Sequence, residues 1–137
     1  NKDIVSWAGA RGLSQLMPST GKAVAKWMGK SVRKKDFFDP KTNLMLGSRY
    51  FEHLMKKLNG NPFLSVAGYN AGGGNVNKWL KNNGNIPTDA FIESIPIRET
   101  RGYVKRVLGT YQMYRTLRET GPLFPNWSQF NQYARPK

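Results

Sequence analysis

The stretch from Val66 to Trp79, VAGYNAGGGNVNKW, limits what this chain can fold into more than any other part of it. An apolar segment leads into Tyr69 and Asn70, and three consecutive glycines at positions 72 to 74 follow before residues that favour a helix resume. Glycine tolerates positive φ and lets another group approach the backbone closely, so the pattern predicts a buried helix that ends on a polar pair at the wall of a site. A helix with a glycine stop and an exposed last turn explains the same residues.

Helical signals recur along the rest of the chain. Asp39-Pro40 and Asn61-Pro62 each place a capping side chain before a proline at the first helical position, and apolar residues then follow at steps of three and four. The expected helices span residues 19–28, 40–58, 62–70, 74–82, a short segment after Thr88-Asp89, and 98–119. No sustained strand alternation appears. With 137 residues and 39% hydrophobic content, the sequence predicts one domain, 1–137, that is all or mainly α.

Apolar residues outside the clear helical periods are also expected to be buried. Residues 1–18 are irregular, yet their large apolar side chains should pack on the domain with Ser6 and Gln15 among them. The side chains expected inside are Ile4, Val5, Trp7, Leu13, Leu16 and Met17 here, Ala23, Val24 and Trp27 in the first helix, and Val104, Val107, Tyr111, Tyr114 and Leu117 in the last.

The charge balance favours an anionic partner. Lys and Arg total 22 against 8 Asp and Glu, a formal charge of +14. Nucleic acid, an anionic membrane surface and an acidic cell-wall polymer all fit this charge. The basic residues are spread along the chain, and the run Arg33-Lys34-Lys35 is expected to be a solvated loop. No apolar run approaches the roughly 20 residues of a membrane-spanning helix.

The residue types exclude several chemistries. There is no cysteine, and the lone His53, expected at the surface beside Glu52, supports neither a metal site nor a Ser/His/Asp arrangement. The glycines form no GxGxxG motif or P-loop, so no cofactor is predicted. Carboxylate chemistry remains. Glu93 has the most apolar neighbours in sequence, and a structural carboxylate paired with Arg98 or Arg101 explains it as well as a functional one.

Four separated stretches together resemble one family. They are GARGLSQLMPSTG from Gly9, DPKTNLMLGSRYF from Asp39, AGYNAGGGNVNKWL from Ala67 and ESIPIRETRGYVKRVL from Glu93. In this order they resemble the catalytic domain of soluble lytic murein transglycosylases, which has a goose-lysozyme-like helical fold. The resemblance implies cleavage of the β-1,4 bond between N-acetylmuramic acid and N-acetylglucosamine in peptidoglycan, leaving a 1,6-anhydro end. Such an enzyme uses a single glutamate as acid and then base.

The sequence departs from the family at that glutamate. In the family it belongs to a Glu-Ser-x-(aromatic)-Asn motif, and Asn1 resembles the last residue of this motif. None of the eight acids matches the glutamate, so we expect an N-terminally incomplete catalytic domain that has no bond-breaking activity alone and that a missing N-terminal segment would complete. By the same resemblance Tyr69 positions the glutamate, and Ser6, Gln15, Met17, Asn70 and Glu93 bind the substrate.

Two features weaken particular assignments, and two other functions stay open. Ser14 replaces a methionine common in the family, which removes an apolar contact, and Gln15 and Met17 could instead fill the core. A peptidoglycan-binding or scaffold module without catalysis fits the same motifs, whereas specific nucleic-acid binding rests on charge alone. The implied partners are peptidoglycan glycan strands, without a specific nucleic acid or a membrane span, and the implied location is the periplasm or cell envelope.

Overall fold

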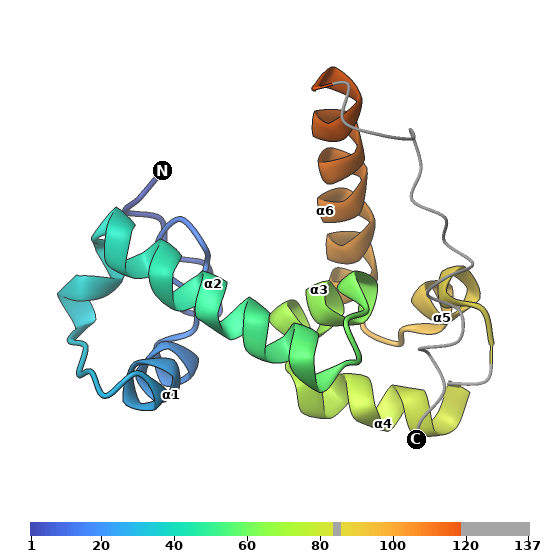
Figure 1. Ribbon diagram of the computed structural model, residues 1–137, viewed down its shortest axis with the longest axis horizontal. Helices are drawn as coiled ribbons and strands as arrows, with labels where there is room; N and C mark the ends of the chain where they lie inside the picture. Colours follow the sequence, from blue (N-terminus) through green and yellow to red (C-terminus); the bar gives the residue numbers. More distant parts are fainter. Residues whose placement is uncertain (84–85, 119–137) are drawn as a thin grey trace. The chain divides into compact units, whose positions relative to one another are not determined.

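The computed structural model of the chain describes residues 1–83 and 86–118 (Figure 1). Its helices are α1 (Pro18–Trp27), the 3-10 helix η1 (Lys34–Phe38), α2 (Pro40–Lys57), α3 (Pro62–Ala71), α4 (Gly73–Asn83), α5 (Thr88–Ser94) and α6 (Arg98–Leu117). Within the described ranges the only β structure is two isolated bridges, Val5 with Arg11 and Arg11 with Leu16. The prediction of a mainly α chain is therefore confirmed. The chain forms two compact units, Asn1–His53 and Leu54–Lys137.

The first unit opens with a segment that folds back on itself through main-chain hydrogen bonds. Arg11 and Leu16 exchange two of them, at 3.0 and 3.1 Å, and the Gly12 N–H donates to the Ile4 carbonyl at 3.1 Å. Leu16 is buried at 2% exposure. The expectation that the other apolar side chains pack inside is wrong, because the segment satisfies its own backbone without burying them. Those exposed are Ile4, Val5, Trp7 at 91%, Leu13 and Met17.

Helix α1 turns a different face inward from the one predicted. It begins at Pro18 after Met17, without a side-chain cap, and it buries Gly21, Val24 and Ala25. A Cβ atom on Gly21 would lie 2.3 Å from Cε1 of Phe37, so the bare backbone at Gly21 receives the buried ring of η1. The predicted stripe therefore holds only at Val24, while Ala23 and Trp27 are exposed.

Helix α2 begins at Pro40, as predicted, and ends within one residue of the expected position. The Asp39 carboxylate accepts a hydrogen bond from the Thr42 N–H at 2.8 Å. The hydrogen bond of the Thr42 side chain and, after it, this main-chain bond lower the pKa of Asp39. In the first unit α2 buries Asn43 and Leu46, whereas Leu44 is exposed. Arg33 to Lys35 are exposed as expected, although Lys34 and Lys35 lie in η1 rather than in a loop.

The second unit is built around α3, which is buried from Phe63 through Gly68. Asn61 caps this helix by accepting from the Phe63 and Leu64 N–H groups, as the sequence predicts. Helices α4 and α6 both pack on α3 (Figure 1). Between Phe63 and Gly68 the only polar side chain of α3 is Ser65, whose hydroxyl donates to the Asn61 carbonyl. This explains the central place of α3, because a helix segment that is apolar on all sides is stable only when it is covered.

In the described part of the chain, the fully buried residues of helix α6 lie in its first half. Thr100 and Val104 are buried, whereas Tyr111, Tyr114 and Leu117 are 55%, 58% and 71% exposed. The prediction that these last three face inward is therefore wrong for the described part of the chain. The predicted end at residue 119 lies outside the described residues, and so does the tail that follows.

Candidate functional site

Tyr69 and Asn70 lie in the last turn of α3, and both are half-buried. The Asn70 Oδ1 atom accepts a hydrogen bond from the Thr100 hydroxyl in α6 at 2.6 Å, and Thr100 is only 1% exposed. This partly buried bond fixes the orientation of the Asn70 amide. The side chains that end α3 are thus held against the first turn of α6.

The glycines after Asn70 leave one side of the chain open. Gly72 ends α3 at a φ of 87°, and its N–H donates to the Gly68 carbonyl at 2.8 Å. A Cβ atom added at Gly72 or Gly74 would meet no described atom within 4 Å, whereas one at Gly73 would lie 3.2 Å from Leu54. Gly73 therefore packs against Leu54, whereas the two glycines that flank it border open space, and the wall of a site at this position stays a prediction.

Glu93 lies near the end of α5, and its carboxylate points to solvent. It pairs with the Lys105 ammonium of α6 at 2.5 Å, and the two side chains are 62% and 52% exposed. The predicted apolar surroundings and the predicted pairing with Arg98 or Arg101 are therefore wrong. Arg101 instead donates to the Ile95 carbonyl at 3.0 Å and to the Glu93 carbonyl at 3.4 Å. These bonds stabilise the turn between α5 and α6.

The candidate residues of the first unit lie in its folded-back segment. Ser6 accepts from the Ala10 N–H through its hydroxyl oxygen at 3.0 Å, and the Gln15 amide donates to the Gly12 carbonyl at 2.8 Å. Gln15 also has a φ of 48°, which is uncommon for a residue with a side chain. Met17 is 40% exposed, so its thioether does not fill the core.

Asn43 holds this segment in place through hydrogen bonds, although no sequence pattern indicates it. The side chain is 0% exposed, and its Oδ1 accepts from the Ser14 N–H and lies 2.7 Å from the Ser14 hydroxyl. Its Nδ2 donates to the carbonyls of Arg11 and Phe37 at 3.0 and 2.9 Å. The serine that replaces a methionine in the predicted motif therefore makes a polar contact, and the GARGLSQLMP and DPKTNLMLG motifs meet at one buried amide.

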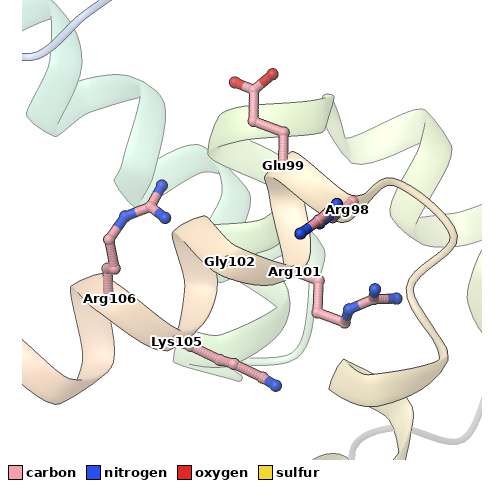
Figure 2. Close-up of a pocket in the computed structure, with 6 residues that line it drawn as sticks. All are labelled: Arg98, Glu99, Arg101, Gly102, Lys105 and Arg106. Atoms are coloured by element: carbon pink, nitrogen blue, oxygen red, sulfur yellow. The ribbon is translucent and has the colours of Figure 1, made fainter.

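A basic pocket of about 510 Å³ lies along the first turns of α6. It is lined by Arg98, Glu99, Arg101, Gly102, Lys105 and Arg106. In Figure 2, Arg101 and Lys105 extend to the same side of the helix, and the Glu99 carboxylate points away from them. The neighbouring Tyr103 is half-buried, which raises the pKa of its hydroxyl, while Arg106 acts in the opposite direction.

The described residues offer no buried acid. Of the eight carboxylates, Glu119 lies outside the described ranges, and none of the others is buried. No group of three or more His, Asp or Glu side chains that could hold a metal ion occurs in residues 1–83 and 86–118. His53, expected to be a surface residue, is half-buried and lies 4.5 Å from the Trp27 ring, centroid to centroid. No helix in the described part is both long and apolar enough to cross a bilayer.

The sequence motifs and this helical architecture together match one family. The profile of the transglycosylase SLT domain matches residues 1–92, which is more than half of the chain. The chain therefore belongs to the transglycosylase SLT domain family. The matched region includes the Asn43 junction and the Tyr69-Asn70 pair, and it ends immediately before Glu93.

Relatives extend the similarity beyond the profile. The chain is 41% identical to the soluble lytic murein transglycosylase of Escherichia coli K12 over 118 residues, which cover 84% of this chain and 18% of the relative. It is 27% identical over 135 residues to the membrane-bound lytic murein transglycosylase D of the same organism, with 95% of this chain and 28% of the relative covered. The chain thus spans about a fifth of the length of the soluble relatives it matches.

Solved structures show the same fold. The 70 kDa soluble lytic transglycosylase of E. coli superposes with a TM-score of 0.85 at 38% identity, over 92% of this chain and 21% of that one. An inactive mutant of the Pseudomonas aeruginosa lytic transglycosylase Slt, in which glutamine replaces a glutamate, gives a TM-score of 0.81 at 37% identity, over 91% of this chain and 21% of that one. The predicted lysozyme-like lytic transglycosylase fold is therefore confirmed.

Proposed function

We propose that this chain is the glycan-binding part of a lytic transglycosylase catalytic domain that acts on peptidoglycan strands. The observation that carries the proposal is the 2.6 Å hydrogen bond between Asn70 and Thr100. It joins the YNAG motif to the ETRGYV motif, although the two residues are 30 positions apart in sequence. The substrate, murein, is taken from the soluble relatives, which are murein transglycosylases.

The proposed reaction breaks the β-1,4 bond between N-acetylmuramic acid and N-acetylglucosamine without adding water. A neutral carboxyl group donates its proton to the leaving O4 atom as the bond from C1 to O4 breaks. The resulting carboxylate then removes the proton of the sugar's own 6-hydroxyl as O6 forms a bond to C1. The product is a 1,6-anhydro end, and one carboxylate suffices because no water needs activating.

We place this carboxyl group outside the 137 residues. A general acid on a sugar needs an apolar site that keeps it protonated near neutral pH, and the described carboxylates are all at least partly exposed. Glu93, the best sequence candidate, is 62% exposed and paired with Lys105. The inactive Glu-to-Gln mutant of the P. aeruginosa enzyme agrees with a glutamate in this role. The chain alone is therefore expected to bind glycan without cleaving it.

The remaining residues are proposed to hold the sugar and the acid. Tyr69 supports the catalytic glutamate through its hydroxyl, and Asn70 offers the Nδ2 group of an amide that Thr100 holds in place. The other proposed substrate-binding residues are Ser6, Gln15, Met17 and Glu93. For Gln15, the carbonyl oxygen is the group we assign to the sugar, because Nε2 donates to Gly12.

The Tyr69→Phe variant tests the proposal in the whole protein. We expect kcat for release of anhydro-muropeptides to fall about tenfold or more, while KM changes little, since the lost hydroxyl acts on the catalytic acid. Tyr103→Phe is the matched control, because it removes a hydroxyl from another half-buried tyrosine of the same unit, and it should leave kcat unchanged. An unchanged kcat in Tyr69→Phe would remove Tyr69 from this role.

A peptidoglycan-binding or scaffold module without catalysis is the alternative that the same motifs support. Mass determination of the native chain and a turnover assay separate the two functions. Release of anhydro-muropeptides by a protein that carries an upstream glutamate supports the enzyme, and binding without release supports the module. Either function places the protein in the periplasm or cell envelope, where its substrate lies.

A further inference from the structure

We propose that the exposed second half of α6, residues 105–118, docks on a membrane surface that carries anionic lipids. In Figure 1 the last turns of α6, in orange to red, extend away from α3, against which the helix packs. At 1.5 Å per residue, about 21 Å of helix separates Tyr114 from Thr100, the residue that holds Asn70. The docking face is therefore distinct from the proposed glycan contacts, and the inference does not rest on the proposed function.

Four large apolar or aromatic side chains lie on one side of this half of the helix. They are Tyr111, Met113, Tyr114 and Leu117, and each is between 55% and 71% exposed. At 100° per residue, the four fall within about 160° of the helix circumference. Tyr111 lies two turns after the buried Val104 and on the same side, so the stripe that the first half buries continues as an exposed surface. An exposed apolar surface that is rimmed by polar residues marks an interaction site.

The charges that accompany this apolar face are all positive. Residues 105–118 include Lys105, Arg106, Arg115 and Arg118 but no Asp or Glu. Arg106 and Arg118 occupy the same side of the helix as the apolar residues, one before them and one after. The Arg115 guanidinium group lies 5.9 Å from the centre of the Tyr111 ring, so a cation sits beside an exposed aromatic side chain. The face is thus complementary to an anionic surface with an apolar layer beneath it.

This combination fits an anionic bilayer better than it fits nucleic acid. Aromatic side chains are favoured at the level of the lipid headgroups, and aliphatic side chains gain by leaving water at the acyl boundary. Arginine reaches lipid phosphates with its charged end while its methylene groups lie on apolar surface. The phosphates of a duplex would contact the arginines equally well, but they would leave Met113 and Leu117 in water. The apolar residues therefore select the lipid surface.

Flotation with lipid vesicles at physiological salt tests the docking. The 137-residue chain should bind vesicles of phosphatidylglycerol and phosphatidylcholine about tenfold or more tightly than vesicles of phosphatidylcholine alone. Tyr114→Gln/Leu117→Gln should weaken binding to the anionic vesicles about tenfold, because it removes two large apolar groups from the interface. Equal binding to both kinds of vesicle would overturn the proposal.

The control for this variant is Trp27→Gln/Leu44→Gln, which removes an aromatic and a leucine side chain from the first unit. Both side chains are about half exposed, and their loss should change vesicle binding by less than about twofold. Circular dichroism checks that both variants fold. Equal losses of binding in the two variants would mean that any exposed apolar residue serves, and that result would also overturn the proposal.

Single labelled cysteines test which side of α6 meets the lipid. The chain has no cysteine of its own, so one introduced thiol can carry an environment-sensitive fluorophore. Emission from labelled Leu117→Cys should rise about twofold or more on anionic vesicles, as expected for a group that leaves water. Thr116→Cys is the matched control, because the exposed Thr116 is turned about 100° from Leu117 and lies outside the apolar face. Its emission should change little.

Two outcomes of the labelling experiment would overturn the proposal. An equal rise at both positions would mean that this side of α6 does not face the bilayer. Strong emission from labelled Leu117→Cys before vesicles are added, unchanged afterwards, would mean that the face is covered within the protein.

DNA binding and turnover by Tyr114→Gln/Leu117→Gln complete the test. Affinity for duplex DNA should be unchanged, and a loss as large as that for vesicles would assign the face to nucleic acid and overturn the proposal. In the whole protein, the variant should cleave soluble murein fragments at the normal rate, because neither residue belongs to the proposed glycan site. A fall in that rate would place the face in the glycan site and overturn the proposal. Membrane docking and the proposed function can therefore fail separately.

Discussion

At the scale of single residues, two buried polar side chains hold the family motifs together. Asn43 does so in the first unit, where all of its hydrogen-bonding partners are inside the protein. Asn43→Leu keeps the branched shape of the side chain, although leucine is larger, and it leaves two carbonyls and one N–H without this partner. We expect the free energy of unfolding to fall by about 3 kcal/mol, because each buried group left unpaired costs about 1 kcal/mol or more. Urea denaturation measures the loss.

Ser14→Ala is the control for Asn43→Leu. It removes the hydroxyl next to Asn43 Oδ1 and leaves the main-chain bond from the Ser14 N–H in place. Its cost should be near 1 kcal/mol, the usual net value of one hydrogen bond. If the two variants lost equal stability, Asn43 would not be the centre of the junction.

Thr100→Val tests the corresponding contact in the second unit. The valine keeps the shape of threonine and removes the donor to Asn70 Oδ1, so the Asn70 amide loses its fixed orientation. We expect about 1 kcal/mol less stability and, if Asn70 binds sugar as proposed, weaker glycan binding by calorimetry. Thr100→Ser, which keeps the hydroxyl, should preserve both. If the Thr100→Val variant bound glycan normally, the hydrogen bond between Thr100 and Asn70 would not be needed for glycan binding.

The sequence could not reveal Asn43 or Thr100 as junctions, and it misplaced Glu93, for related reasons. A polar residue inside an amphipathic helix has no signature in the hydrophobic period. Ser14 and Arg11, which bond to Asn43, are 29 and 32 positions away, and Asn70, which bonds to Thr100, is 30 positions away. Glu93 follows the buried Ile92, but neighbours in a helix point about 100° apart. Apolar neighbours in sequence therefore did not make its surroundings apolar.

At the scale of elements, the close approach at Gly12 fixes the folded-back segment against the rest of the first unit. Gly12 has a φ of 71°, and a Cβ atom there would lie 2.4 Å from the Phe37 carbonyl oxygen. Gly12→Ala should therefore lower stability by about 3 kcal/mol through strain and steric overlap together. Gly29→Ala shares a positive φ of 65° but meets no atom within 4 Å, so it should cost only about 1 kcal/mol. Similar losses of stability in Gly12→Ala and Gly29→Ala would mean that backbone strain at positive φ is the only cause and that steric overlap at Gly12 adds nothing.

The start of α2 gives a prediction for pH. The hydrogen bonds from the Thr42 side chain and N–H lower the pKa of Asp39, so its charged form is favoured in the folded state. The contribution to stability is thus present above the unfolded pKa and is lost as pH falls through the lower folded value. Asp39→Ala should lower the thermal midpoint at pH 7, and the difference should shrink as the pH falls below about 3.9, the ordinary pKa of this group. A difference that did not change with pH would exclude the carboxylate as its source.

Helix starts were the most predictable elements, because a cap and a proline act locally. Asp39-Pro40 and Asn61-Pro62 each begin a helix where expected. Burial was less predictable, since it depends on what covers a face. Helix α6 keeps an apolar spacing through Tyr111, Tyr114 and Leu117, yet within the described residues these side chains are exposed. The same limit explains residues 1–17, where only Leu16 among the large apolar residues predicted to pack is buried.

At the scale of the whole molecule, the charge of +14 attracts every anionic polymer. Experiments must therefore distinguish this non-specific attraction from specific binding. Attraction to nucleic acid through charge alone depends on the release of counterions, and it falls steeply as salt rises. We expect fluorescence anisotropy to show affinity for duplex DNA dropping at least tenfold between about 50 and 200 mM salt. Contacts to neutral sugar hydroxyls and amides release no counterions, so affinity for uncharged N-acetylglucosamine oligomers should change less than about twofold. DNA affinity that survived 200 mM salt and differed between sequences would instead favour a nucleic-acid function, because recognition of bases, unlike charge, persists when the phosphates are screened.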